Sequence, residues 1–77
     1  MIDFVVQLEY LTNKWKPVIR YDNAHGFVHR DIYSITGSKK RREKIHAKTL
    51  KDAVLIAYND LSHNYQNYIE RFEKDQL

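Results

Sequence analysis

The C-terminal third of the chain restricts the fold most. Residues 49–74 contain neither Gly nor Pro, and apolar side chains recur among them at intervals of three or four. This spacing places the apolar side chains on one side of an α-helix. They are Leu50, Val54, Ala57, Leu61, Tyr65, Tyr68 and Phe72. The pattern predicts a helix over 50–74, roughly 37 Å long, with Thr49 as its N-cap and Asp52 near its positive end. Polar residues fill the opposite face: Asp60, His63, Asn67 and Glu70.

The first 22 residues show the two-residue period of β-strands. In residues 2–11 the side chains expected to point inward are Ile2, Phe4, Val6, Leu8 and Tyr10. Residues 15–22 alternate in the same way, and there we expect Trp15, Ile19 and Tyr21 to be buried. Turn-forming residues separate the two segments, so the two predicted strands should pair antiparallel.

A third strand is expected at about 27–36, after a sharp corner that ends in Gly26. Its phase is ambiguous, and we favour Val28 and Ile32 pointing to the core. Residues 39–48 form either a fourth strand or a mobile arm. The predicted fold class is α+β: an antiparallel three- or four-stranded β-meander with one long C-terminal helix packed on one face. We expect residues 1–77 to form a single domain.

The chain has 77 residues and no Cys. A domain of this size buries only a thin core, and without Cys it has neither disulfides nor a Cys-ligated zinc site. Its stability must come from packing or from self-association, so a homodimer is one of the states we consider. No apolar run approaches the roughly 20 residues of a membrane span, and the N-terminus lacks the features of a signal peptide. We expect a cytoplasmic protein with no membrane partner.

Ionisable residues gather around the predicted corner. If the apolar side chains of the second and third strands point inward, the open sheet face displays Arg20, Asp22, His29, Asp31 and Tyr33. A group that titrates near neutrality, carboxylates to orient it and a fixed cation would meet there. Cross-strand ion pairs on a solvated face would have the same composition. His25 and His29 with Asp22 or Asp31 also offer metal ligands, but their spacing across a turn is not that of a helical metal site. We therefore predict no metal and no cofactor.

Positive charge is concentrated in residues 39–51, which hold seven Lys or Arg and one Glu. A local positive field attracts phosphate even on a nearly neutral protein. The candidates for nucleic-acid binding are Lys39, Lys40, Arg41, Arg42, Lys44 and Lys48. An edge strand that carries Lys to prevent sheet-to-sheet aggregation would have the same composition.

The pattern Trp15-x-Pro17-Val18-x-Arg20-x-Asp22-x-Ala24-His25-Gly26, followed by His29-x-Asp31, resembles a group of short prokaryotic proteins with no assigned function. More distantly, the run Arg20-Tyr21-Asp22-Asn23-Ala24, with His29 on the next strand, resembles the TumE-like toxins of toxin–antitoxin pairs. Arg30 and Asp31 stand where that family has further adjacent histidines. The TumE-like resemblance implies a small toxin that acts on RNA or another part of translation and is encoded beside a cognate antitoxin.

Three function hypotheses remain open. The first is a metal-independent ribonuclease, in which His29 and His25 share the acid and base roles, and Asp31 or Asp22 orients one of them. Arg20 or Arg30 would stabilise the transferring phosphate. The second is a nucleic-acid-binding module without chemistry that uses residues 39–51. The third is a structural or partner-binding protein whose thin core is completed by dimerisation.

Overall fold

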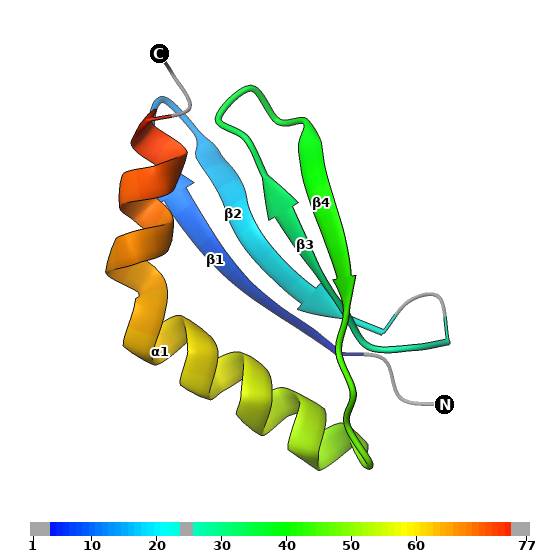
Figure 1. Ribbon diagram of the computed structural model, residues 1–77. Coiled ribbons are helices and arrows are strands. Elements are labelled where there is room, and N and C mark those ends of the chain that lie inside the picture. Colours follow the sequence, from blue (N-terminus) through cyan, green and yellow to red (C-terminus); the bar gives the residue numbers. More distant parts are fainter. Residues whose placement is uncertain (1–3, 24–25, 75–77) are drawn as a thin grey trace.

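The computed structural model describes residues 4–23 and 26–74, and their architecture is the predicted α+β meander with a C-terminal helix (Figure 1). The elements are β1 (Val5–Leu11), β2 (Trp15–Asp22), β3 (His29–Tyr33), β4 (Lys39–Lys44) and α1 (Leu50–Lys74). The four strands are antiparallel and lie in the order β1-β2-β3-β4. Within the described residues, no helix is both long enough and apolar enough to cross a membrane.

The basic run begins with the fourth strand, which decides between the two alternatives for this segment. β4 pairs antiparallel with β3 after a short turn in which Gly37 adopts a φ of 92°. A side chain at that position would be strained, which explains the Gly. β4 lies at the edge of the sheet, and its Lys and Arg side chains are mostly exposed. Such charges discourage pairing with the edge of another sheet.

A bulge in β2 places Trp15 on the face opposite to the one predicted. Leu8 pairs with Ile19 but Glu9 pairs with Pro17, so Val18 is an extra residue in the ladder. A bulge inverts the side-chain phase of the residues that precede it. Trp15 therefore points away from α1 and is 62% exposed, so the prediction that it is buried was wrong.

The core lies between the sheet and α1. Phe4, Val6, Leu8 and Tyr10 pack against it from β1, as their alternation predicted, while Ile2 lies outside the described residues. Ile32 packs against it from β3, which confirms that half of the favoured phase. Val28 precedes β3 and is only partly buried. Ile35 follows β3 and turns into the core, so the strand ends earlier than the predicted residue 36.

α1 begins and ends where the sequence predicted. Its start is capped by Thr49, whose hydroxyl oxygen accepts a hydrogen bond from the Asp52 amide at 3.1 Å. Figure 1 shows that the helix bends near its middle. In the middle of the helix, the Ser62 hydroxyl donates to the Tyr58 carbonyl one turn earlier, and this type of bond commonly bends helices. α1 packs on β1 and β2.

The buried stripe of α1 is rotated from the predicted one. Ala57, Leu61 and Phe72 are buried as expected, and Ala53 joins them. Val54 and Tyr65 were predicted to face the core, but they are 37% and 46% exposed. The rotation brings Asp60, which was assigned to the outer polar face, into the space between helix and sheet.

Asp60 can face inward because three elements satisfy its carboxylate. It accepts hydrogen bonds from the hydroxyl groups of Tyr21 on β2 and Tyr68 on α1, the latter at 2.6 Å. The Nη1 atom of Arg30 on β3 lies 3.1 Å from its Oδ2 atom. The Nε atom of Arg30 also donates to Glu43 on β4 at 2.9 Å. We call Tyr21, Arg30, Glu43, Asp60 and Tyr68 the interlayer network.

The pKa shifts in the interlayer network predict how stability depends on pH. Burial raises the pKa of Asp60, but the hydrogen bonds from Tyr21 and Tyr68 outweigh it, so the net pKa lies below its ordinary value. The bond from Arg30 likewise lowers the pKa of Glu43. Carboxyl groups with a lowered folded-state pKa stabilise the protein fully above their unfolded values of about 4, and that contribution is lost as the pH falls further.

We therefore expect urea unfolding midpoints to fall as the pH drops from 5 to 2. At the alkaline end, burial and the bond to Asp60 raise the pKa of Tyr68 to about 12. The unfolded chain then ionises first, so stability should also fall above roughly pH 10. In the Asp60→Asn variant the urea unfolding midpoint should fall less steeply as the pH drops from 5 to 2. The variant and the wild type are compared by this slope, so that a difference in their stability at neutral pH does not affect the comparison. If the substitution leaves this slope unchanged, the acid dependence of stability comes from other carboxylates.

Candidate functional site on the open sheet face

The strand register brings a cluster of charged side chains together on the sheet face that α1 does not cover. Arg20 pairs with Asp31 and Asp22 with His29 across β2 and β3. Asp31 also pairs with Arg42 on β4. Ile19, Tyr21 and Ile32 face the helix layer, so these alternate residues face the other way. Four of the predicted site residues, Arg20, Asp22, His29 and Asp31, thus lie side by side, whereas His25 lies outside the described residues.

The imidazole of His29 is enclosed at the centre of this cluster. Its Nε2 atom lies 2.8 Å from Asp22 Oδ1 and 3.6 Å from Asp31 Oδ2. Its Nδ1 atom lies 3.3 Å from the carbonyl oxygen of Phe27, whose ring also contacts the imidazole with centroids 5.4 Å apart. His29 is only 1% exposed. Both ring nitrogens therefore face acceptors, and the ring has little access to solvent.

Three cationic side chains neutralise the two carboxylates. Arg42 Nε lies 2.8 Å from Asp31 Oδ1, and Lys39 Nζ lies 3.1 Å from Asp31 Oδ2. Arg20 Nε lies 3.0 Å from Asp22 Oδ2. Burial raises the pKa of Asp31, but the bonds from Arg42 and Lys39 outweigh it and hold the pKa below its usual value. The acids thus act as anchors, because they hold the cations at fixed places on the sheet. We call Arg20, Asp22, His29, Asp31, Lys39 and Arg42 the open-face cluster.

A divalent metal ion would compete with these ion pairs. One ligand atom each from Asp22, His29 and Asp31 lies within 4.8 Å of the others, which is close enough for a shared ion. Asp31, however, already contacts Arg42 and Lys39. An ion between the carboxylates would have to displace or approach these positive charges, at a cost in repulsion. The arrangement therefore favours an ion-pair cluster over a metal centre.

Aromatic rings flank the open-face cluster. Lys39 Nζ lies 5.9 Å from the centre of the Tyr33 ring, and Lys44 Nζ lies 5.6 Å from that of Phe27. Phe27 is 38% exposed, and Tyr33 is partly buried. Trp15 lies at the β1–β2 hairpin end of the same face, since it pairs with Leu11 beyond the bulge. Accessible rings beside fixed cations form a surface on which unpaired bases can stack.

The six basic residues proposed to bind nucleic acid do not form one surface. Lys39, Arg42 and Lys44 lie on the open face opposite Tyr33, Asp31 and His29. Arg41 pairs with Ile32 on the helix side, and both it and Lys40 line a hollow beside α1. Lys48 lies in the connection between β4 and α1. Half of the predicted set is therefore available to the open face.

Sequence reasoning missed three contributors to this face. Arg42 was predicted to belong to the basic run, and its contact with Asp31 was not predicted. If residues 39–44 are treated as a strand that pairs with residues 29–33 across the turn, the two residues fall opposite each other. Phe27 shares the odd-numbered phase of His29, which places it on the same face, but it was not named as a site residue. Trp15 could not have been placed there, because its position depends on the bulge.

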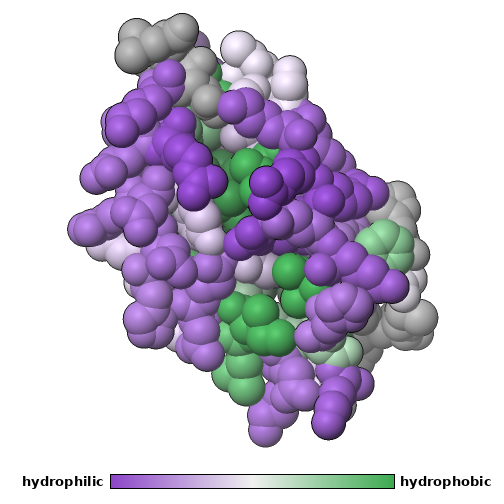
Figure 2. All heavy atoms as spheres, in the orientation of Figure 1, coloured by the Kyte–Doolittle hydropathy of each residue, from purple (hydrophilic) through white to green (hydrophobic). Residues whose placement is uncertain are grey.

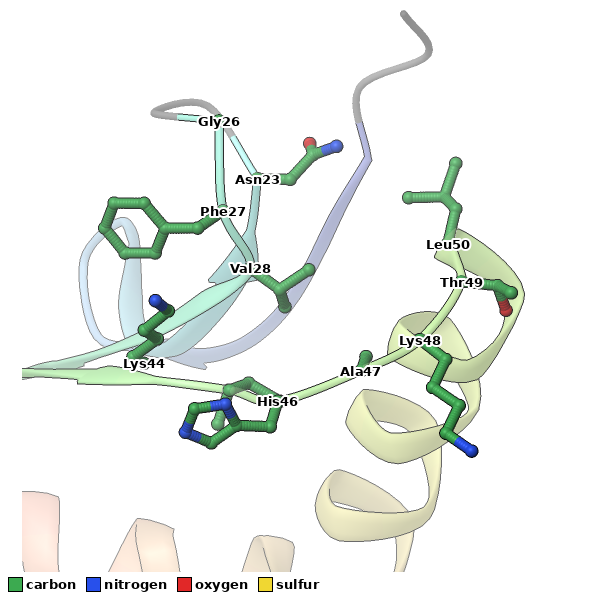
Figure 3. A pocket seen from close by; sticks show the side chains of 11 residues that line it. Asn23, Gly26, Phe27, Val28, Lys44, His46, Ala47, Lys48, Thr49 and Leu50 are labelled. Atoms are coloured by element: carbon green, nitrogen blue, oxygen red, sulfur yellow. The ribbon is translucent and has the colours of Figure 1, made fainter.

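A second hollow, of about 890 Å³, opens between the corner before β3 and the start of α1. Its lining includes Asn23, Val28, Leu50 and the segment 44–49. Figure 3 shows the side chains of His46 and Lys48 pointing away from Val28 and Leu50. Its polar groups therefore do not converge on a point, and the open-face cluster is the better candidate site.

The sequence of the whole chain, residues 1–77, matches the model of a domain of unknown function, DUF7718. The chain belongs to this family. No curated protein and no solved structure matches the chain significantly. Membership agrees with the predicted uncharacterised family, but it carries no information about the TumE-like toxins, so that relation stays a prediction. The function of this family member must be argued from its own geometry.

Proposed function

We propose that the open sheet face binds single-stranded nucleic acid, with RNA as the first ligand to test. The observation that carries the proposal is the fixed set of cations, from β2 and β4, held around buried carboxylates next to accessible aromatic rings. Cations track the phosphates of a single strand, and aromatic rings stack on its bases without strong sequence preference. An uncovered four-stranded sheet is also a surface on which several bases can lie side by side.

Binding is supported better than cleavage by the position of His29. A general base must come within hydrogen-bond reach of the proton that it removes, directly or through one water. The His29 ring is buried, and its two nitrogens face Asp22 and the Phe27 carbonyl. The narrower proposal, a metal-independent ribonuclease that uses His29, His25, Asp31, Arg20 and Asp22, requires this ring to become accessible when RNA binds.

We expect weak, salt-sensitive binding to a fluorescently labelled oligouridine in an anisotropy titration. Lys39→Ala combined with Lys44→Ala should remove two phosphate contacts and reduce the slope of log K against log salt by about 1.4, at about 0.7 per contact. Tyr33→Leu should weaken binding by about 1–3 kcal/mol if the ring stacks on a base. A DNA strand of the same sequence shows whether the 2′-hydroxyl contributes.

The matched control removes the same charge away from the open face, by Lys14→Ala with Lys51→Ala. Lys14 lies in the β1–β2 turn and Lys51 on the exposed side of α1. If the control pair reduces the salt slope as much as the open-face pair, binding reflects overall charge alone and the proposed surface is wrong. Absence of binding to both RNA and DNA at low ionic strength would also contradict the proposal.

A further inference from the structure

The two outer strands of the sheet differ in how their edges are protected. β1 and β4 each have one neighbouring strand, and Figure 1 shows β1 at the edge beside α1 and β4 at the far edge. Every residue of β4 is Lys, Arg or Glu, and Figure 2 shows hydrophilic side chains over this strand. β1 carries a single charged residue, Glu9. Because charged side chains on an edge strand discourage pairing with another sheet, the β1 edge lacks the protection that the β4 edge has.

The side chains of β1 are incompletely covered. None of its seven residues is fully buried, whereas β2 next to it has four buried residues. Val5 and Leu11, near the two ends of the strand, are 54% and 55% exposed, and they alternate with the residues that face the core. On the helix side, Val6, Leu8 and Tyr10 pack against the core but are only partly buried. The β1 edge thus leaves apolar surface available on both faces of the sheet.

The backbone groups at the open edge belong to the odd-numbered residues of β1. The Phe4 amide donates to the Oδ1 atom of Asn23, which follows β2, at 3.0 Å. Backbone N–H and C=O groups of successive residues point to opposite sides of a strand. The groups of the odd-numbered residues from Val5 to Leu11 therefore point away from β2, and the described part of the chain has no other strand there. A strand placed along this edge would meet a row of donors and acceptors.

We propose that β1 pairs antiparallel with β1 of a second copy of this chain across a two-fold axis, which joins the four strands of each copy into one sheet. Full overlap of the two strands puts the axis at Leu8. Val5 then meets Leu11 of the second copy, and Gln7 meets Glu9. The first pair is apolar, and in the second an amide donates to a carboxylate. An axis at Glu9 would instead bring two like charges together. The register with the longest overlap is therefore self-complementary, as a two-fold interface requires.

α1 presents an aromatic flank on the same side of the molecule. Tyr58, Tyr65 and Phe72 are seven residues apart, which places them on one side of the helix. The Phe72 ring contacts the Tyr10 ring of β1, with centroids 5.6 Å apart, so this side of α1 faces β1. Tyr65 and Tyr58 are 46% and 64% exposed. Exposed aromatic side chains beside an unprotected edge strand are typical of a surface that another protein covers.

The same two-fold axis would bring the two helices to packing distance. α1 packs on both β1 and β2, so its axis lies about half a strand spacing inside β1, and the two-fold axis lies about half a spacing outside it. With strands about 4.8 Å apart, the helices of the two copies would lie roughly 10 Å apart on one side of the sheet. Packed helices are about 8–10 Å apart. Pairing of β1 and packing of α1 are therefore compatible in one dimer.

Assembly through β1 ends at two copies. Both outer strands of the joined sheet would be β4, whose charges discourage further pairing. The sheet face opposite the helices stays uncovered in each copy, so the proposed nucleic-acid surface remains accessible. The dimer does not depend on nucleic-acid binding.

Sedimentation equilibrium tests the pairing at protein concentrations from about 10 µM to about 1 mM. The wild-type mass should rise from that of one chain toward that of two. Val5→Lys with Leu11→Lys places like charges opposite each other at both ends of the β1 pair and should raise the dissociation constant at least about tenfold. Both positions are more than half exposed in the single chain, so this variant should fold, which circular dichroism verifies.

The matched comparison changes the same two positions to opposite charges, by Val5→Lys with Leu11→Glu. In the proposed register each introduced Lys faces an introduced Glu, so this variant should dimerise at least about tenfold more tightly than the variant with two Lys substitutions. For the same reason, the variant with two Lys substitutions should form mixed dimers with Val5→Glu/Leu11→Glu, although each alone is mainly a single chain.

The contribution of α1 is tested by Tyr65→Glu, which places a charge at the proposed helix contact and should weaken the dimer about tenfold. The control is Asn67→Glu, which adds the same charge to an exposed position about 200° further around the helix. It should leave the dissociation constant within about twofold.

Four outcomes would overturn the proposal. The first is the mass of one chain at every concentration. The second is equal dissociation constants for the Lys/Lys and Lys/Glu variants of β1, which would place any contact elsewhere. The third is a mass beyond two chains, and the fourth is an unchanged dissociation constant in Tyr65→Glu, which would remove α1 from the interface. Lys39→Ala with Lys44→Ala should weaken RNA binding and leave the dimer unchanged, so the two proposals fail independently.

Discussion

Replacing Asp60 by Ala is expected to lower the free energy of unfolding by about 3–5 kcal/mol. The side chain of Asp60 is 18% exposed, and it is paired with Arg30, which is 20% exposed. Removing the carboxylate leaves the Arg30 Nη1 atom without its carboxylate partner, and the hydroxyl groups of Tyr21 and Tyr68 without their acceptor. Breaking one side of a largely buried ion pair such as this one is more costly than replacing both sides. Because small domains are stable by only about 5–15 kcal/mol, this variant should be close to unfolding at 37 °C.

The measurement is urea unfolding followed by circular dichroism, with Glu70→Ala as the matched control. Glu70 is an exposed carboxylate on the same helix, and its removal should change the free energy of unfolding by no more than about 0.5 kcal/mol. A double-mutant cycle with Arg30→Met tests the mechanism, because the pair removed together should cost clearly less than the sum of the two single changes. Additive effects would show that Asp60 acts through helix packing and not through Arg30.

The sequence alone correctly predicted the features that depend on the periodic spacing of nearby side chains. Alternation along β2 and β3 correctly placed Arg20, Asp22, His29 and Asp31 on one face, and the Thr49 cap correctly located the start of α1. The period also assigned most of the β1 residues to the core. These features depend on neighbours in sequence, which is why a pattern of two or of 3.6 residues is enough to predict them.

The errors arose where a side chain depends on distant partners. Trp15 is exposed because Val18 inserts an extra residue opposite β1, and no local pattern marks that bulge. Asp60 turns inward because Tyr21, Arg30 and Tyr68 meet there from two strands and the helix itself. Hydrophobicity alone assigns an Asp to the surface. The burial of His29 likewise requires Phe27 and the carboxylates that surround it, so the sequence predicted the neighbours of this ring but not its enclosure.

Replacing His29 by Ala is expected to lower the free energy of unfolding by about 3 kcal/mol, because it removes the ring that separates two buried carboxylates. Asp22 Oδ1 would lose its partner at 2.8 Å, and a cavity would form beneath Phe27. If the role of His29 is to donate a hydrogen bond to this carboxylate, Asp22→Asn in the His29→Ala background should restore part of the lost stability. The matched control is His63→Ala on the exposed side of α1, which should change stability by less than about 0.5 kcal/mol.

The same variants distinguish a structural His29 from a catalytic one. Purified wild-type protein and the His29→Ala and His29→Ala/Asp22→Asn variants are incubated with RNA in EDTA at a temperature where all are folded. With a structural role, the double variant regains stability relative to His29→Ala, and no His29-dependent cleavage is seen. With a catalytic role, wild-type protein cleaves RNA, and loss of the acid–base group lowers the rate by about 10²–10⁴ even where stability is restored. Cleavage that depends on His29 in this way would require the buried ring to open toward substrate, and it would replace binding alone as the function of the open face.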